Sequence, residues 1–338
     1  RYSGQPVALV VAESLVQARR AADAVRVHLA AQAVTADFAH DDALIDVQYE
    51  SGEWPSAASS REAPSARARI HCPRVVAMAM EPRAVAVQVQ AQGMTVWLGS
   101  QSPSRARTDI AQAAGLDQAQ VRVITPNVGG AFGSKASVCA EDLLVPWAAW
   151  RLQRSLRWAA TRSEEFSSGM HGRGAVLEGE LHGDAQGHFT ALSADLMFTL
   201  GAWLPFSAVV PLRNAARILP GPYRVDALRI QGQAGQSHAA AVNIYRGAGR
   251  PEAALLMETL VEKLARQLAI DPVELRRRNL IDASEMPYRT PTQEVLDSGD
   301  YKGLLDQACA RFDYPAQRAQ QAQRRQAGEC VGIGVALY

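Results

Sequence analysis

Strand-like and helical segments alternate from residue 84 onward, and this alternation restricts the fold more than any other feature of the chain. Apolar runs at 84–89, 95–98 and 121–124 are typical of strands. A helix is expected between the second and third runs, and a mostly apolar helix is expected over 136–151. Because strands that alternate with helices form a sheet covered by helices, the sequence predicts an α+β, or mixed α/β, fold.

Capping residues indicate where three helices begin or end. Ser102 and Pro103 suit the start of the first helix, and Gly115 suits its left-handed C-terminal cap. Residues 252–268 carry a single apolar stripe, which predicts an amphipathic helix. Asp271 can cap a further helix that follows directly. The second half of the chain is therefore expected to place helices against strands, and weak alternation predicts an antiparallel pair over 175–200.

Length and local composition divide the chain into expected units. With 338 residues, and about 150 residues in a typical domain, the chain has room for about two domains. The first unit is expected to contain a strand over 7–11, a helix capped by Ser14 and a strand over 25–29. Because the chain opens at Arg1 and closes on an apolar run, we expect further sequence at both ends. The expected units are 1–50, a linker rich in Ser, Ala, Pro and Arg at 51–74, a main domain at 75–328, and the start of another domain at 329–338.

Composition argues against several classes of protein. Hydrophobic residues make up 48% and charged residues 20%, as in ordinary globular chains. Lys and Arg number 35 against 34 Asp and Glu, so the net charge of +1 offers no general attraction to nucleic acid or an anionic membrane. No apolar run reaches the ~20 residues of a membrane span. Single, scattered cysteines exclude a zinc ribbon or a cysteine-bound iron–sulfur cluster and favour a reducing compartment such as the cytoplasm: Cys72, Cys139, Cys309 and Cys330.

A glycine-rich loop at 128–135 precedes the predicted helix at 136–151. Its three glycines let backbone N–H groups approach an anion closely at a helix start. The loop is not a Walker A motif, because Ser134 separates Gly133 from Lys135. The loop therefore predicts either a phosphate cradle or a tight turn in which only glycine fits.

A second glycine-rich loop, 245–251, leads directly into the amphipathic helix. Arg246 and Arg250 flank two glycines at the helix N-terminus, where guanidinium groups, free amides and the helix dipole all favour a phosphate. The alternative is an exposed arginine pair at an ordinary turn. The histidines have no ligand spacing, so no metal ligands are predicted.

A series of short landmarks, in this order and spacing, resembles the molybdopterin-binding large subunit of the xanthine dehydrogenase and aldehyde oxidase family. The resemblance implies that residues 1–50 end an α/β hammerhead domain and that 75–328 form the first molybdenum-cofactor-binding domain. The landmarks, besides the two glycine-rich loops, are Gln5-Pro6-Val7-Ala8, Met80-Glu81-Pro82, Gly99-Ser100-Gln101, Thr161-Arg162-Ser163-Glu164, His171-Gly172-Arg173, Gly221-Pro222-Tyr223 and Arg276-Arg277-Arg278-Asn279-Leu280.

The resemblance also implies roles for individual residues. Gln101 corresponds to a glutamine whose side-chain amide approaches the oxo group on molybdenum. The catalytic base of the family is a glutamate, which is expected to lie outside this chain. Gly247 occupies the position at which carbon monoxide dehydrogenases carry a copper-binding cysteine, so carbon monoxide is not the expected substrate. The implied cofactor contacts are Gly129, Gly130, Ala131, Phe132 and Gly133 in the first loop and Arg246, Gly247, Ala248 and Gly249 in the second.

The implied activity is hydroxylation of an aldehyde or an N-heteroaromatic compound with water as the source of oxygen. The implied cofactor is molybdopterin with molybdenum, in its cytosine dinucleotide form. A [2Fe-2S] small subunit and an FAD-binding medium subunit are the implied electron carriers, in a dimer of heterotrimers. The chain alone is expected to be inactive. The alternative is a non-catalytic cofactor-binding or assembly protein with the same fold, whereas nucleotide hydrolysis is not expected without a P-loop.

Overall fold

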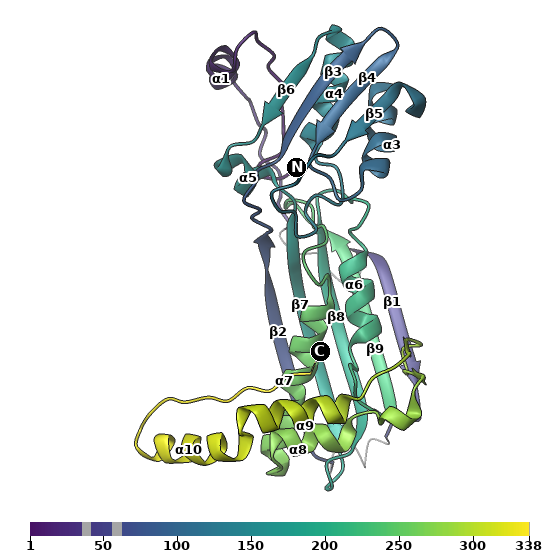
Figure 1. Ribbon diagram of the computed structural model, residues 1–338, viewed down its shortest axis with the longest axis vertical. Helices are drawn as coiled ribbons and strands as arrows, with labels where there is room; N and C mark the ends of the chain where they lie inside the picture. Colours follow the sequence, from purple (N-terminus) through teal and green to yellow (C-terminus); the bar gives the residue numbers. More distant parts are fainter. Residues whose placement is uncertain (36–41, 56–62, 338) are drawn as a thin grey trace.

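The structure of the chain is a computed structural model that describes residues 1–35, 42–55 and 63–337. Figure 1 shows the two larger sheets, one above the other along the long axis, with a narrow waist of loops between them. No helix among these described residues is long and apolar enough to cross a bilayer. The mixture of sheets and helices confirms the predicted fold class.

The smaller sheet contains the alternating segment that begins at residue 84. Its strand order is β5-β4-β3-β6, in which β3 and β4 form the predicted hairpin and β5 runs parallel to β4 after a crossover through α3. Apolar side chains of α3 and α4 close a core on one face of this sheet. The elements are β3 (Ala84–Gln90), β4 (Gly93–Leu98), α3 (Pro103–Ala114), β5 (Val121–Ile124), α4 (Ala140–Leu152) and β6 (Leu156–Ala159).

The helix expected over 136–151 begins four residues later than predicted. Its first turn is set by a capping interaction, because the Asp142 carboxylate accepts a hydrogen bond from the backbone N–H of Cys139 at 2.9 Å. Residues 136–139 therefore extend the glycine-rich loop. Helix α3 ends where the sequence predicts, because Gly115 takes the left-handed conformation after it, with a φ of 69°.

The larger sheet has the strand order β1-β9-β8-β7-β2. The antiparallel pair predicted over 175–200 is confirmed as β7 and β8, and β8 pairs in parallel with β9 after a crossover through α6. Helices α6 and α7 cover one face of the sheet (Figure 1) and form the main hydrophobic core with it. The elements are β1 (Ala43–Ser51), β2 (Ser65–Val76), β7 (His171–Gly183), β8 (Phe189–Gly201), α6 (Val210–Ile218), β9 (Ala227–Gln236) and α7 (Arg250–Leu268).

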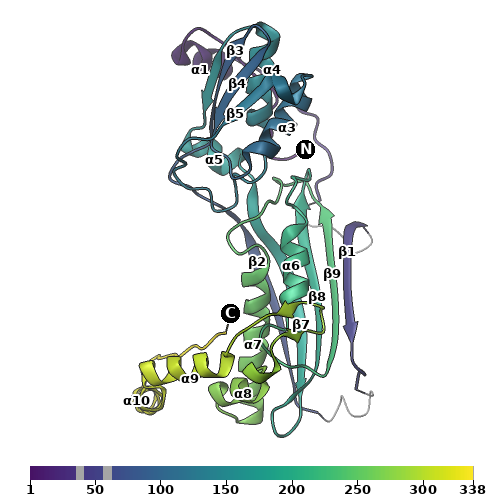
Figure 2. The same ribbon diagram turned by 45° about the vertical axis from the view of Figure 1, so that its right-hand side comes forward.

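The helices predicted after residue 250 are confirmed. The apolar stripe of α7 lies in the core, where Leu256, Leu260 and Leu264 have no exposed surface. Asp271 caps the next helix by accepting hydrogen bonds from two N–H groups of its first turn. Figure 2 shows the last helices projecting from the lower end of the molecule. The remaining elements are α5 (Arg162–Ser168), α8 (Pro272–Asn279), β10 (Tyr288–Arg289), β11 (Val295–Leu296), α9 (Tyr301–Phe312) and α10 (Tyr314–Gln326).

The expectation of a linker over 51–74 is wrong from Ser65 onward. Strand β2 begins there and pairs with β7 along its length, and β1, which was expected to belong to the first unit, pairs with β9 in the same sheet. Ala66 and Ala68 point into the core while Arg67 and Arg69 point outward, and this alternation is weak because alanine is small. Residues 56–62 lie outside the described part.

At the N-terminus, the predicted helix forms but its neighbouring strands do not. Helix α1 (Leu15–Asp23) begins at Ser14, whose side chain accepts a hydrogen bond from Gln17 N–H. The runs at 7–11 and 25–29 are not strands, and most of their large apolar side chains are exposed. Within the described residues no strand pairs with either run, and an isolated strand leaves its backbone groups unpaired. The apolar run at 331–337 is not a strand either.

Candidate anion-binding site

The two glycine-rich loops lie against each other at the waist, although more than a hundred residues separate them in sequence. The backbone N–H of Arg246 donates a hydrogen bond to the carbonyl oxygen of Phe132 at 3.0 Å. The side-chain amide of Asn243 lies 3.4 Å from the carbonyl oxygens of Gly133 and Ser134. At Gly133 a Cβ atom would lie only 2.6 Å from the carbonyl oxygen of Ile244, so this close contact requires glycine. The two loops therefore form one continuous surface.

Each loop holds one residue other than glycine in the left-handed region. Phe132 has a φ of 53° and Ala248 a φ of 36°, conformations that cost free energy and persist only where the surroundings enforce them. Turns of this kind leave backbone N–H groups available to an anion. The N–H groups of Ala131, Phe132 and Gly247 donate no hydrogen bond to the described residues. Both loops thus offer unused donors on adjoining segments.

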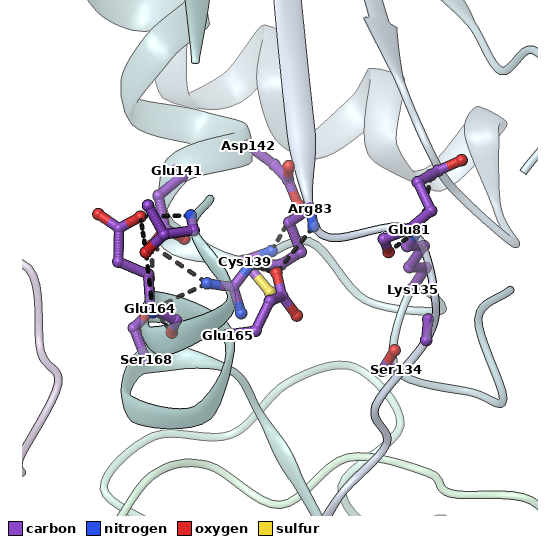
Figure 3. A network of polar contacts seen from close by, with 12 residues as sticks. Glu81, Arg83, Ser134, Lys135, Cys139, Glu141, Asp142, Glu164, Glu165 and Ser168 are labelled. Carbon is purple, nitrogen blue, oxygen red and sulfur yellow. Dashed lines mark hydrogen bonds and ion pairs between the residues drawn. The ribbon is translucent and has the colours of Figure 1, made fainter. Parts of the chain in front are cut away.

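The first loop is held by a carboxylate from outside it. The Oε2 atom of Glu81 accepts a hydrogen bond from Gly129 N–H at 2.7 Å, and its Oε1 atom lies 2.6 Å from the Nζ atom of Lys135 (Figure 3). The Lys135 side chain is only 5% exposed, so this ion pair is largely shielded from water on the lysine side. The ammonium group and the Gly129 N–H together hold the pKa of Glu81 below its usual range. Glu81 is therefore a charged carboxylate fully engaged by the loop.

Gln101 lies at the edge of the first loop. Its backbone N–H donates to the carbonyl oxygen of Lys135 at 2.9 Å, and its side chain is exposed. The structure therefore brings together the three groups that were singled out from the sequence: Gln101, the first loop and the second loop.

The second loop is held by Arg173. Its guanidinium donates to the carbonyl oxygen of Arg246 at 2.8 Å and lies 3.2 Å from both oxygens of Glu252. It also stacks over the ring of Tyr245, with 4.7 Å between the guanidinium carbon and the ring centroid. Glu252 is 2% exposed and sits in the first turn of α7, so the pair joins the loop to the core helix.

Arg246 gives the shared surface its charge. Its side chain is exposed and forms no hydrogen bond or ion pair with any residue in the described ranges. The positive end of the 19-residue helix α7 lies four residues further on. Since the carboxylates of Glu81 and Glu252, which help to hold the two loops, are already paired with cations, the surface presents donors and positive charge. This donor set fits a phosphate group.

A buried network behind the first loop fixes the segment that carries Glu81. The Arg83 guanidinium donates to the Ser168 hydroxyl at 2.8 Å and lies within 3.5 Å of Glu141 and Glu165 (Figure 3). Burial raises the pKa of the nearby Asp142 to about 6, and the adjacent Glu141 carboxylate also raises it. No local pattern in the sequence indicated this network, because its members come from the start of β3, from α4 and from α5.

The described residues contain no group of three or more His, Cys, Asp or Glu side chains that could hold a metal ion. The sequence did not indicate which groups hold the loops. These groups are Glu81, Lys135 and Arg173. Their segments were noticed as landmarks, but the 54 positions between Glu81 and Lys135 leave no spacing signal to connect them.

Known proteins resemble this chain in sequence and in structure. The family described as "Molybdopterin cofactor-binding domain" matches residues 38–280, which is well over half of the chain. The nicotine 6-hydroxylase large subunit of Paenarthrobacter nicotinovorans is 28% identical over 72% of this chain and 30% of its own length. The carbon monoxide dehydrogenase large chain of Hydrogenophaga pseudoflava is 30% identical over 72% of this chain and 31% of its own length. The chain thus spans about a third of the length of these curated relatives.

A solved structure gives the same assignment. Quinoline 2-oxidoreductase from Pseudomonas putida 86 superimposes with a TM-score of 0.88 and 27% identity, over 94% of this chain and 42% of the other. The resemblance inferred from the sequence is confirmed by these matches. The chain belongs to the molybdopterin cofactor-binding family that includes the large subunits of xanthine dehydrogenase and carbon monoxide dehydrogenase type.

Proposed function

We propose that this chain is the part of a molybdenum hydroxylase large subunit that grips the phosphate-bearing tail of a molybdopterin between its two glycine-rich loops. The observation that carries the proposal is the hydrogen bond from Arg246 N–H to the Phe132 carbonyl oxygen. It joins two loops whose remaining donors are unused and whose exposed guanidinium lacks a partner among the described residues. Such a surface has anion recognition as its main chemical capability.

Each loop has a distinct part in holding the cofactor. Backbone N–H groups of Gly130, Ala131, Phe132 and Gly133 would bind phosphate oxygens from one side, while Gly129, whose N–H donates to the Glu81 carboxylate, would fix the start of the loop. Arg246, with the amides of Gly247 and Gly249, would bind them from the other side and from the helix N-terminus, while Ala248, whose N–H donates to the Tyr245 carbonyl oxygen, would shape the turn. The Phe132 side chain is 43% exposed and would cover an apolar edge of the ligand. The Gln101 amide would donate a hydrogen bond near the metal. The bound cofactor supplies two-electron oxidation of an electron-poor carbon, with water as the source of oxygen.

The proposed substrate class is an aldehyde or an N-heteroaromatic compound. Two of the similar proteins are named for nicotine and quinoline, which supports the heteroaromatic class. Carbon monoxide chemistry that relies on a copper-binding cysteine is disfavoured at Gly247. A Cβ atom there would lie 2.7 Å from the Pro251 ring, at a backbone φ of 91°, so a cysteine would be both crowded and strained.

Electrons are proposed to leave through an iron–sulfur small subunit and an FAD-binding medium subunit, in a dimer of heterotrimers. The names of several relatives, which call them large subunits or subunits of a complex, support such an assembly. All four cysteines of the chain are free thiols, as a reducing compartment such as the cytoplasm would keep them.

The test is the cofactor content of the protein purified as it occurs in the cell. We expect about one molybdenum per chain by elemental analysis, a fluorescent pterin after oxidation, and cytidine monophosphate after acid hydrolysis. Arg246→Ala should lower the molybdenum content at least tenfold while the circular dichroism spectrum stays unchanged. Protein that contains neither molybdenum nor pterin would overturn the proposal. Loaded protein that reduces no dye with any aldehyde or heteroaromatic compound would instead support the non-catalytic alternative.

A further inference from the structure

Three landmarks of the sequence meet at a single ion pair. Glu81 belongs to Met80-Glu81-Pro82, Lys135 ends the first glycine-rich loop, and Gln101 belongs to Gly99-Ser100-Gln101. The Glu81 carboxylate and the Lys135 ammonium group lie 2.6 Å apart, and the lysine side chain is buried. The molybdopterin family assignment leaves this pair without a role.

Glu81 ties the two ends of the first loop together. One carboxylate oxygen accepts the N–H of Gly129 at the start of the loop, and the other takes the ammonium group of Lys135 at its end. The backbones are joined as well, since Glu81 N–H donates to the Gly129 carbonyl oxygen at 3.0 Å. At Gly129 a Cβ atom would lie 2.7 Å from the Cβ of Glu81, so the carboxylate is packed directly against the loop. A single side chain thereby closes the loop.

Lys135 passes this constraint on to Gln101. Its carbonyl oxygen accepts the backbone N–H of Gln101 at 2.9 Å, and its Nζ atom also reaches the carbonyl oxygen of Glu81 at 3.3 Å. The position of the glutamine backbone is therefore set relative to the loop amides by one lysine. Among the described residues the ammonium group of Lys135 has no anionic partner other than Glu81. The position of the lysine side chain therefore depends on Glu81.

The segment that carries Glu81 is itself fixed. The Arg162 guanidinium donates to the carbonyl oxygens of Ala79 and Met80, both at 2.8 Å. On the other side, the backbone N–H of Arg83 donates to the Glu165 carboxylate at 2.7 Å. Glu81 therefore projects from a backbone held on both sides, which suits a group that positions others.

We propose that Glu81 is a positioning residue, which acts through Lys135 to set the distance and orientation between Gln101 and the amides of the first loop. The proposal rests on the proposed function, since it concerns the groups that would hold the cofactor. Loss of the Glu81–Lys135 pair should leave both sheets folded and let the loop and Gln101 move independently. The expected consequence is poor retention of the cofactor rather than unfolding.

The test combines two variants with hydrogen–deuterium exchange, in the protein purified as it occurs in the cell. Glu81→Gln keeps the size of the side chain and an acceptor for Gly129 N–H but removes the charge. Lys135→Met removes the ammonium group and keeps the apolar stem. Glu329→Gln is the matched control, because Glu329 forms an exposed ion pair at 2.7 Å with Arg324 of α10, a helix that projects from the lower end of the molecule in Figure 1.

In either test variant we expect amide exchange at least tenfold faster in peptides covering 99–102 and 129–136, with no change in peptides of α7. Molybdenum content should fall at least threefold, whereas Glu329→Gln should match the unmodified protein in both measurements. The double variant should show the same local loss of order and recover part of the stability lost in Glu81→Gln, because the buried ammonium group is then no longer left unpaired. A purely structural role would instead accelerate exchange throughout the chain, including the peptides of α7.

Unchanged exchange at 99–102 and 129–136 in both variants would overturn the inference. So would accelerated exchange with full molybdenum content, because the pair would then position nothing the cofactor needs. These results can be told apart from failure of the proposed function. If the proposed function fails, the unmodified protein would contain no molybdenum or pterin. The local acceleration of exchange in the variants would still show that the Glu81–Lys135 pair holds the first loop.

Discussion

The two glycine-rich loops meet at one surface but are stabilised in different ways. The second loop runs without a break into α7, whose apolar stripe forms much of the main core. The first loop is followed by irregular residues up to Ala140, and an ion pair from a distant segment holds it. Damage to the second loop should therefore spread through the fold. Damage to the first should stay local and appear as lost order or lost ligand.

The largest effect is expected at Gly249. A Cβ atom there would lie 1.9 Å from the carbonyl oxygen of Pro211 in α6, and the backbone φ of 88° adds strain. Gly249→Ala should lower the free energy of unfolding by about 4 kcal/mol, measured by urea denaturation. Gly328→Ala is the control, since its φ of 86° is similar but no atom lies within 4 Å, and its cost should be about 1 kcal/mol. Equal costs would show that the second loop is not packed against α6.

Removal of Arg173 should have the next largest effect. Arg173→Ala leaves the Glu252 carboxylate, which is 2% exposed, buried without its cation, and such a loss costs about 3 kcal/mol. Adding Glu252→Gln should recover part of that loss, because the unpaired charge is then gone. A double-mutant cycle by urea denaturation measures the coupling. Strictly additive losses would contradict the claim that this pair joins the loop to α7.

A smaller and pH-dependent effect is expected on the side of the first loop, at Asp142. Burial raises the pKa of this carboxyl to about 6 from an ordinary value of 3.8, so the folded chain binds the proton more tightly than the unfolded chain. The stability that the protonated carboxyl contributes is present below pH 4 and is lost as the pH rises through 6. Asp142→Asn, which keeps an acceptor for Cys139 N–H, should therefore stabilise by about 1–2 kcal/mol at pH 8.

At pH 4 the same variant should differ little from the unmodified protein. Melting temperatures of both proteins at pH 4 and pH 8 provide the check. A difference independent of pH would mean that the Asp142 carboxyl does not titrate between these values, and that the network around Arg83 keeps it ionised.

The smallest effect on stability is expected at Arg246. Its exposed side chain has no partner among the described residues, so Arg246→Ala should change the free energy of unfolding by less than about 0.5 kcal/mol. A larger decrease in the free energy of unfolding, measured by urea denaturation, would show that Arg246 stabilises the fold rather than being available to bind a ligand. Comparing the loss of stability in Arg173→Ala with that in Arg246→Ala distinguishes the arginine that holds the second loop, Arg173, from the arginine that is free to bind a ligand, Arg246.

Local patterns predicted much of this fold, because they depend on neighbouring residues. The hairpin of β3 and β4, the C-terminal cap of α3, the N-terminal cap of α8 and both glycine-rich loops follow from short-range spacing. Strand β2 was missed because its inward positions are mostly alanine, which contrasts weakly with arginine. The strands expected around Val7 and Val27 have strand-like apolar patterns but no partner strand in the described chain.

The candidate site could be predicted only in part. The loops themselves were visible in the sequence, and the family resemblance implied that they share a ligand. The ion pair of Glu81 with Lys135 and the hydrogen bond of Arg173 to the second loop were not visible, because they join residues separated by 54 and 73 positions. Contacts between residues so far apart in the sequence depend on how the sheets and loops pack in the folded chain. No periodicity in the sequence indicates that packing.

Anomalous X-ray scattering at the molybdenum absorption edge, from crystals of the protein purified as it occurs in the cell, tests most directly whether the two loops share one cofactor. We predict a single peak beside Gln101, with continuous ligand density that reaches both Phe132 and Arg246. A peak remote from the waist, or density that touches one loop while the other stays bare, would contradict the assignment.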